Sequence, residues 1–201
     1  MSILSTEQIH TYLREEPDKA LVITPLLEPS EQIDKCSVDL RLGNEFIVTR
    51  KTSFPVVDPT EVGQGEKKVE RYQDKIHLRF HEEFVLHPNQ LILGSTLEYI
   101  ALPNDLAAYV TGRSSWGRLG LVIATASFIA PCWKGSITLE LVNLGEAPLI
   151  LFPGIRIAQL VLHKVVGEET YTGKYRCATG PEFARIHKDT ELDFFGKVKT
   201  D

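Results

Sequence analysis

Between residues 84 and 161 the chain alternates short apolar runs with turns, and this pattern limits the possible folds more than any other feature. The turns are rich in proline, asparagine and glycine. The runs are Phe84–Leu86, Leu91–Leu93, Tyr99–Leu102, Ala107–Val110, Leu121–Ala124, Ile137–Val142, Leu149–Phe152 and Ile155–Val161. Many short strands joined by such turns are typical of an all-β barrel or sandwich. We therefore predict a mainly β fold.

A short helix is predicted ahead of these strands. Ser5 and Gln8 match a capping box, in which each side chain bonds the backbone N–H of the other residue. Ile9 and Leu13 then fall on one helix face, and the helix is expected to end before Pro17.

Two further segments have distinct patterns. Residues 38–48 carry alternating apolar side chains and are predicted as strand. Residues 58–76 are polar and contain two glycines, so we expect an exposed excursion without a chemical role.

Length and charge limit the classes of protein. The 201 residues fit one domain over residues 1–201, long enough to bury a core. A net charge of −5 argues against a nucleic-acid partner, because binding a phosphate backbone normally needs a basic face. The chain shows no run of eighteen apolar residues and no signal-peptide pattern, so we expect no membrane partner and a cytoplasmic location. Three widely spaced cysteines, Cys36, Cys132 and Cys177, predict reduced thiols.

Two features between Gly112 and Glu140 could carry chemistry. Gly112 is followed by Arg113, Ser114 and Ser115, and guanidinium and hydroxyl groups suit phosphate oxygens. A simple polar turn would explain the same residues. Glu140 alternates with Leu139 and Leu141 on a predicted strand. It is either a surface glutamate or a partly buried carboxylate that transfers protons near neutral pH.

The last part of the chain, residues 166–201, is predicted as a C-terminal arm. Its basic and aromatic residues include Tyr171, Lys174, Tyr175, Arg176 and Arg185. Such an arm could close over a nucleotide, or it could be a disordered basic tail.

Zinc-dependent deamination is disfavoured by the spacing of possible ligands. That chemistry needs H-x-E followed later by P-C-x-x-C. His81 and Glu83 supply the first part and Pro131-Cys132 begins the second, but Gly135 occupies the position of the second cysteine. We therefore predict no zinc and no protein-bound metal. P-loop, dinucleotide-binding and G-x-S-x-G motifs are also missing from the sequence.

Taken together, the segments resemble the dCTP deaminase branch of the dUTPase superfamily over nearly the whole chain. The matching segments are ILSTEQI, CSVDLRLGNEF, LPNDLAAYVTGRSSWGRLGL, SITLELVN, PLILFPGIRIAQLV and YTGKYRCATGP. The resemblance implies a distorted β-barrel of the dUTPase-like type with a short N-terminal helix. It also implies a homotrimer with sites between subunits, and hydrolysis of dCTP to dUTP and ammonia without zinc, a step of nucleotide metabolism.

The resemblance also implies roles for individual residues. Glu140 takes a proton from a water that attacks ring carbon C4 and delivers it to the ring nitrogen and the leaving ammonia. Ser114 and the backbone carbonyl of Ala126 hold the water, and Arg118 stabilises charge beside Glu140. Substrate binding falls to Arg113, Ser115, Tyr171, Lys174 and Tyr175, with Mg2+ bridging the triphosphate oxygens. The arm closes over the bound nucleotide.

Two departures from the family pattern affect the substrate. Ala130 stands where the family usually has an aspartate that contacts the sugar and is tied to diphosphate cleavage in the dUTPase and bifunctional branches. Ala178 stands where a glutamine usually reads the edge of the base. These departures leave two alternatives to dCTP deamination: a nucleotide-binding protein without turnover, and a deaminase for a modified cytosine nucleotide. A dUTP diphosphatase is disfavoured by Ala130.

Overall fold

The structure is a computed structural model that describes residues 2–49, 57, 73–167 and 170–191. Its elements are α1 (Thr6–Tyr12), β1 (Val22–Thr24), α2 (Pro29–Gln32), β2 (Ile33–Asp34), β3 (Ser37–Arg41), β4 (Glu45–Thr49), β5 (Gln73–His77), β6 (Phe84–Leu86), β7 (Leu91–Ala101), β8 (Leu106–Gly112), α4 (Ser114–Gly117), β9 (Leu121–Ile123), β10 (Phe128–Ile129), β11 (Lys134–Asn143), β12 (Leu149–Leu151), β13 (Arg156–Lys164) and the 3-10 turn η2 (Ile186–Lys188). The mainly β prediction is confirmed.

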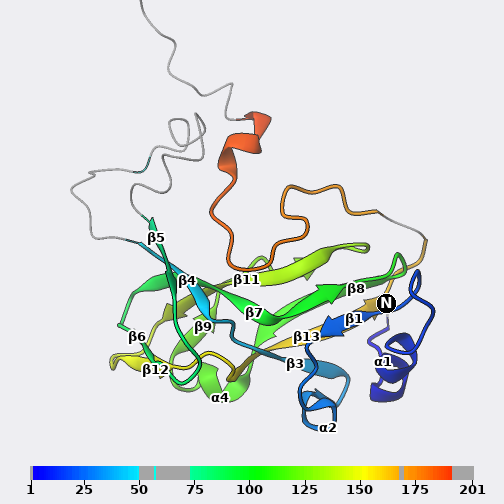
Figure 1. The fold of residues 1–201 in the computed structure, drawn as a ribbon, viewed down its shortest axis with the longest axis horizontal. Coiled ribbons are helices and arrows are strands. Elements are labelled where there is room, and N and C mark those ends of the chain that lie inside the picture. The colour runs from blue at the N-terminus through cyan, green and yellow to red at the C-terminus, as the bar shows by residue number, and fades with distance from the viewer. Residues whose placement is uncertain (1, 50–56, 58–72, 168–169, 192–201) are drawn as a thin grey trace, which may run out of the picture.

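The strands form two large sheets and one small one (Figure 1). The first sheet has the order β5-β4-β7-β11-β9, with β1 also paired to β7. The second has the order β10-β8-β13-β3-β2, and β12 pairs with β6. Within the described residues these pairings leave the sheets open rather than closing a continuous barrel.

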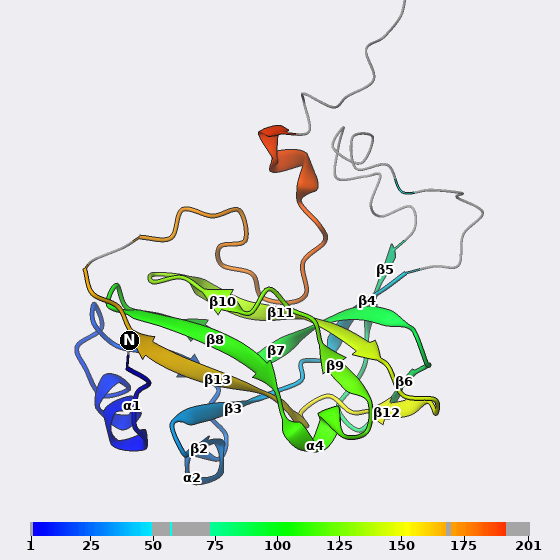
Figure 2. The same cartoon turned by 180° about the vertical axis from the view of Figure 1, so that it is seen from behind.

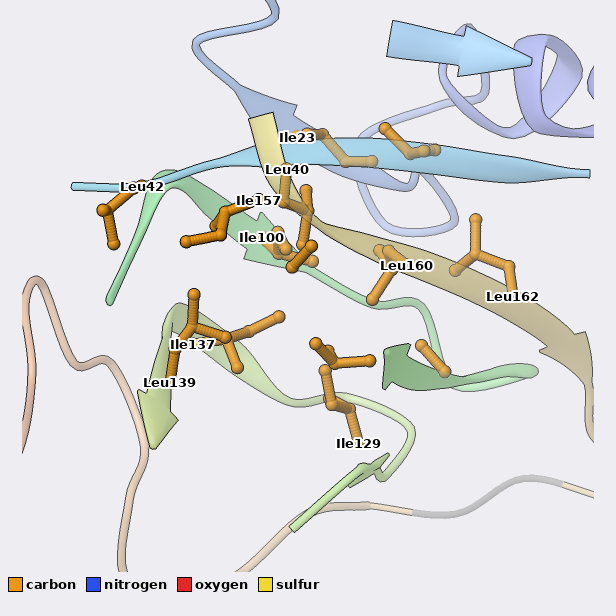
Figure 3. Close-up of a cluster of buried hydrophobic side chains, with 14 of the residues drawn as sticks. Ile23, Leu40, Leu42, Ile100, Ile129, Ile137, Leu139, Ile157, Leu160 and Leu162 are labelled. Atoms are coloured by element: carbon orange, nitrogen blue, oxygen red, sulfur yellow. The ribbon is translucent and has the colours of Figure 1, made fainter. Parts of the chain in front are cut away.

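The hydrophobic core lies between the two large sheets, as Figure 3 shows. Leu40, Leu160 and Leu162 from the second sheet and Ile137 and Leu139 of β11 all belong to this core cluster. Four of these five side chains are fully buried. The alternation of apolar residues along each strand therefore places one face of each sheet in the core and leaves the other available for a site.

The predicted N-terminal helix is confirmed as α1. The Ser5 Oγ accepts the Gln8 N–H at 3.3 Å, and the Gln8 Oε1 accepts the Ser5 N–H at 2.9 Å. Ile9 is fully buried, and the Tyr12 hydroxyl donates to the Asp105 carboxylate at 2.6 Å. The helix is thus capped locally and anchored to the turn before β8.

The prediction of one strand over residues 38–48 is wrong, because β3 and β4 belong to different sheets. The chain crosses between them at Gly43, whose N–H donates to the Ser95 carbonyl at 2.7 Å. A Cβ on Gly43 would lie 2.9 Å from the Ser95 Oγ, so this close crossing requires glycine. The alternation continues through the crossing and therefore conceals it.

Two other boundaries differ from the predictions. The runs Leu91–Leu93 and Tyr99–Leu102 belong to one strand, β7, because Gly94 and the polar residues after it pair with β11. The predicted excursion over 58–76 falls on residues outside the described chain up to 72, but residues 73–76 lie in β5.

A buried carboxylate connects the two large sheets. Glu98 of β7 is fully buried; its Oε2 accepts the Arg41 N–H at 2.9 Å and its Oε1 accepts the Gln32 Nε2 at 3.0 Å. Gln32 Nε2 also donates to the Asp39 carbonyl at 3.1 Å. Glu98 and Gln32 therefore hydrogen-bond with backbone groups of β3 that lie beyond its pairing with β2. Burial raises the pKa of Glu98 to about 7, against the opposing effect of these hydrogen bonds.

The C-terminal segment 170–191 lies across β11. The Cys177 N–H donates to the Lys134 carbonyl and the Ser136 N–H donates to the Ala178 carbonyl, each at 2.7 Å. Figures 1 and 2 show this segment, in orange and red, crossing the body on the side away from α4. None of the described helices has the length and apolar content needed to cross a membrane.

Candidate active site

A cavity of about 580 Å3 lies between β11, the segment before it and the C-terminal segment. Its size is within the usual range for small-molecule sites. Its walls are mainly apolar and aromatic, with a few polar side chains. The lining residues that the following argument uses are Thr125, Ala126, Ala130, Trp133, Thr138, Glu140, Tyr171, Tyr175, Ala178 and Glu182.

Glu140 lines this cavity from β11. Leu139 and Leu141 are fully buried in the core, so alternation turns Glu140 to the other face of the strand. Residues of the C-terminal segment, Tyr171 and Tyr175 among them, line the same cavity. The face that could have been open to solvent is therefore covered, and Glu140 is half-buried.

The segment before β11 fixes the backbone of Glu140. The Glu140 N–H donates to the Thr125 Oγ1 at 2.9 Å, and the Ala124 N–H donates to the Glu140 carbonyl at 2.8 Å. Burial raises the pKa of the Glu140 carboxyl, while a hydrogen bond from the Ala126 backbone lowers it by a smaller amount. The net upward shift suits a group that both accepts and returns a proton near neutral pH.

Ala126 contacts Glu140 through a different group from the one expected. A backbone hydrogen bond that lowers the pKa of a carboxyl comes from an N–H, so Ala126 donates to the Glu140 carboxylate. The family resemblance instead implied that the Ala126 carbonyl holds the attacking water. The structure brings Ala126 to the site, and the role of its carbonyl stays a prediction.

The aromatic residues of the C-terminal segment are held by hydrogen bonds within the segment and from Trp133, the residue before β11. The Tyr175 N–H donates to the Tyr171 hydroxyl at 3.3 Å, and the Trp133 Nε1 donates to the Tyr175 carbonyl at 3.2 Å. Both tyrosines line the Glu140 cavity, and their contacts with a substrate stay a prediction.

The Arg-Ser-Ser turn does not line the Glu140 cavity of its own chain. It begins α4, on which Ser114 and Ser115 are exposed, and Arg118, the residue directly after α4, is exposed as well. Arg113 instead lines a polar hollow of about 640 Å3 on the second sheet. One chain therefore presents the carboxylate and the Arg-Ser-Ser turn at two separate places.

The polar hollow is organised by Asp39. Its side chain is nearly buried and lies 3.3 Å from the Arg113 Nη2 and 3.5 Å from the Arg156 Nη1. Gln159 Nε2 donates to the other carboxylate oxygen at 3.1 Å. The Trp116 Nε1 donates to the Arg156 carbonyl at 3.0 Å and so attaches α4 to β13, the strand that also carries Gln159. Asp39 and Trp116 thus hold the turn while its serines remain exposed.

Lys174 also lies outside the lining of the Glu140 cavity. Its Nζ contacts both carboxylate oxygens of Asp189, at 2.6 and 2.7 Å. A phosphate group that binds the Lys174 Nζ must therefore displace the Asp189 carboxylate or bind the ammonium group together with it.

Several residues of the cavity were missed by the sequence reasoning. Thr125, Thr138 and Glu182 reach it from three segments, and no local motif marks them. Ala130 and Ala178, singled out as departures, both line it. Among the described residues, no three His, Cys, Asp or Glu side chains gather in a way that could hold a metal ion.

The fold and this cavity define a β protein with a partly enclosed small-molecule site. A family model described as dCTP deaminase-like matches residues 3–165. The chain belongs to the dCTP deaminase-like family, as the sequence resemblance indicated.

Individual relatives agree with this assignment. The chain is 44% identical over 179 residues to a protein of Natronomonas pharaonis named dCTP deaminase, covering 86% of this chain and 90% of that protein. It is 39% identical over 200 residues to a protein of Methanothermobacter thermautotrophicus named dCTP deaminase, dUMP-forming, covering 96% and 98%.

A solved structure shares the fold. The crystal structure of 2′-deoxycytidine 5′-triphosphate deaminase from Agrobacterium tumefaciens matches 82% of this chain with a TM-score of 0.61 and 23% identity. The chain spans 46% of the length of that structure's chain. The likeness confirms the expected fold class.

Proposed function

We propose that this protein hydrolyses dCTP to dUTP and ammonia. The observation that carries the proposal is Glu140, a half-buried carboxylate with a raised pKa at the wall of a nucleotide-sized cavity. Family membership and the names of the relatives support the substrate.

Glu140 acts first as a base and then as an acid. Its carboxylate accepts a proton from a water molecule while the water oxygen bonds to C4 of the cytosine ring. The same proton passes to ring nitrogen N3, which gives a tetrahedral carbon. Glu140 then moves the hydroxyl proton to the amino group, the C4–N bond breaks, ammonia leaves and a C4 carbonyl forms. The Ala126 carbonyl holds the water from the same side of the cavity.

A second copy of the chain completes the site. Ser114 on α4 and Arg118 directly after it are exposed and lie outside the Glu140 cavity of their own chain, which supports a site shared between subunits. In this arrangement Ser114 of one copy holds the water near Glu140 of another, and Arg118 stabilises charge there. Arg113 and Ser115 bind the triphosphate. The proposed assembly is a homotrimer.

The C-terminal segment supplies the remaining substrate contacts. Tyr171 and Tyr175 line the cavity, and Lys174 exchanges the Asp189 carboxylate for a phosphate oxygen. The triphosphate would carry magnesium as its own counter-ion, which would neutralise phosphate charge, so no residue of the chain is assigned as a magnesium ligand. The three unpaired cysteines support the expected cytoplasmic location.

The product proposed is dUTP rather than dUMP. Relatives of both kinds match the chain, but Ala130 leaves the cavity without a carboxylate at the position tied to diphosphate cleavage. Small side chains at 130 and 178 also support the second candidate, a protein that binds a nucleotide without turning it over.

Ammonia release and product mass from a panel of cytosine nucleotides with magnesium test the reaction. Wild type is expected to convert dCTP to dUTP, and Glu140→Gln is expected to abolish turnover while retaining binding. Glu146→Gln, at an exposed glutamate outside the cavity, is the matched control. Binding without ammonia release by wild type would favour the second candidate, and dUMP with diphosphate would correct the product.

Mixing two inactive variants tests the shared site. The Glu140→Gln and Arg118→Ala proteins are refolded together, or their subunits are exchanged, to form mixed oligomers. Some sites in these oligomers then combine an intact Glu140 from one chain with an intact Arg118 from another. Random mixing should restore activity at about a quarter of the sites. No recovery in mixed oligomers would place both residues of each site on one chain.

A further inference from the structure

The C-terminal segment brings a second carboxylate, Glu182, into the Glu140 cavity. The Glu182 N–H donates to the Thr138 Oγ1 at 3.2 Å. Thr138 and Glu140 lie two residues apart on the same face of β11 and line the same cavity. Glu182 is therefore attached to β11 at a residue two positions from Glu140, and both carboxylates line one cavity.

Arg185 orients the Glu182 side chain. Its Nη2 lies 2.6 Å from the Glu182 Oε2. Arg185 is itself held by the Lys174 carbonyl at 2.5 Å from its Nη1, and by the Tyr175 hydroxyl, which accepts its backbone N–H at 2.9 Å. A carboxylate offers about four acceptor positions on two oxygens, so this ion pair leaves Glu182 able to accept further hydrogen bonds.

Cytosine and uracil differ at the edge that such an acceptor would contact. Cytosine presents an amino group, which donates, whereas uracil presents a carbonyl oxygen, which accepts. A carboxylate bonds the first and repels the second, because two acceptors facing each other leave both without a proton. Ala178 lines the same cavity and supplies no polar side chain for this task.

We infer that Glu182 is a specificity-determining residue that accepts a hydrogen bond from the amino group of the cytosine ring. The inference rests on the proposed function. It explains how the protein distinguishes the amino group at C4 of its substrate from the carbonyl oxygen at C4 of its product. Loss of the amino group removes the hydrogen bond and favours release of the uracil nucleotide.

Binding of dCTP and dUTP in a background that cannot turn over tests the inference. Calorimetric titrations compare Glu140→Gln with the double variant Glu140→Gln/Glu182→Gln, each with magnesium. A glutamine amide presents either an oxygen or an N–H to the base, so the preference for dCTP over dUTP should fall about tenfold or more. Glu191→Gln in the same background, an exposed position of the same segment outside the cavity, should keep the preference.

If Glu182 had a purely structural role, its replacement would weaken the binding of both nucleotides by the same factor. An unchanged ratio of the affinities for dCTP and dUTP would therefore overturn the inference. A second variant, Glu182→Ala, removes the hydrogen-bonding group altogether and should also lower this ratio. Different results would overturn the proposed function and the role of Glu182. Wild type that neither binds nor deaminates cytosine nucleotides overturns the proposed function, whereas normal turnover with an unchanged ratio overturns only the role of Glu182.

Discussion

The Thr125 hydroxyl accepts the backbone N–H of Glu140 at 2.9 Å, across two segments that are 15 residues apart. The neighbouring Ala124 N–H donates to the Glu140 carbonyl at 2.8 Å. Both backbone groups of Glu140 are therefore held by residues that precede β11. The backbone position of Glu140 is thus set by the loop between β9 and β10, and the C-terminal segment covers the face on which its carboxylate lies.

Replacing Thr125 with valine should reduce turnover. The change keeps the shape of the side chain but leaves the Glu140 N–H without its partner, at a cost of about 1–3 kcal/mol. A cost of this size at the catalytic carboxylate corresponds to a fall of about fivefold to about a hundredfold in kcat. Steady-state kinetics check this, and Thr125→Ser, which restores the hydroxyl, should recover most of the rate. Equal rates for the valine and serine variants would contradict the prediction.

The dependence of rate on pH should reflect the raised pKa of Glu140. The first step needs the ionised carboxylate, so kcat/KM should fall as the pH decreases through this pKa. Because burial raises the pKa, the fall should begin at a higher pH than an exposed glutamate would give. The measurement is a pH–rate profile for dCTP. An acid limb centred at about 4.3, the ordinary glutamate value, would contradict it.

Protein stability should depend on pH through Glu98. The pKa of about 7 in the folded state lies above the ordinary value, so the stabilisation is complete below about pH 4.5 and is lost as the pH rises through 7. This difference corresponds to a loss of about 3 kcal/mol in the free energy of unfolding. Urea unfolding between pH 5 and 8.5 measures it.

Glu98→Gln is the control for that experiment. The amide stays neutral at every pH and can still accept the Arg41 N–H, so the loss between pH 5 and 8.5 should shrink by most of this amount. A variant with the same slope as wild type would assign the pH dependence to other groups.

Trp116→Phe should weaken the substrate contacts of α4. The substitution removes the hydrogen bond from the Trp116 Nε1 to the Arg156 carbonyl but keeps an aromatic ring. A lost neutral hydrogen bond costs about 0.5–1.5 kcal/mol, so the KM for dCTP should rise by about two- to tenfold. The pH–rate profile should not move, because Glu140 is untouched. A shifted acid limb would show that Trp116 acts on the base instead.

The sequence alone determined the local features. The capping box of α1 and most of the strands follow from hydrogen-bonding side chains and alternation over a few residues. Alternation also placed Glu140 on the face opposite Leu139 and Leu141, and the motifs led to the correct family. These features depend on neighbours in the chain, which a sequence displays directly.

Tertiary structure decided what lies over each face. Only the folded chain shows that β3 and β4 enter different sheets, that Glu98 is buried between the two sheets, and that Thr125 and Glu182 line the same cavity as Glu140. It also separates the Arg-Ser-Ser turn from the carboxylate of the same chain. Burial and hydrogen bonding at these positions depend on residues far apart in sequence, such as Gln32 and Glu98, which are 66 residues apart. Local periodicity reports which way a side chain points, but not which distant segment covers it.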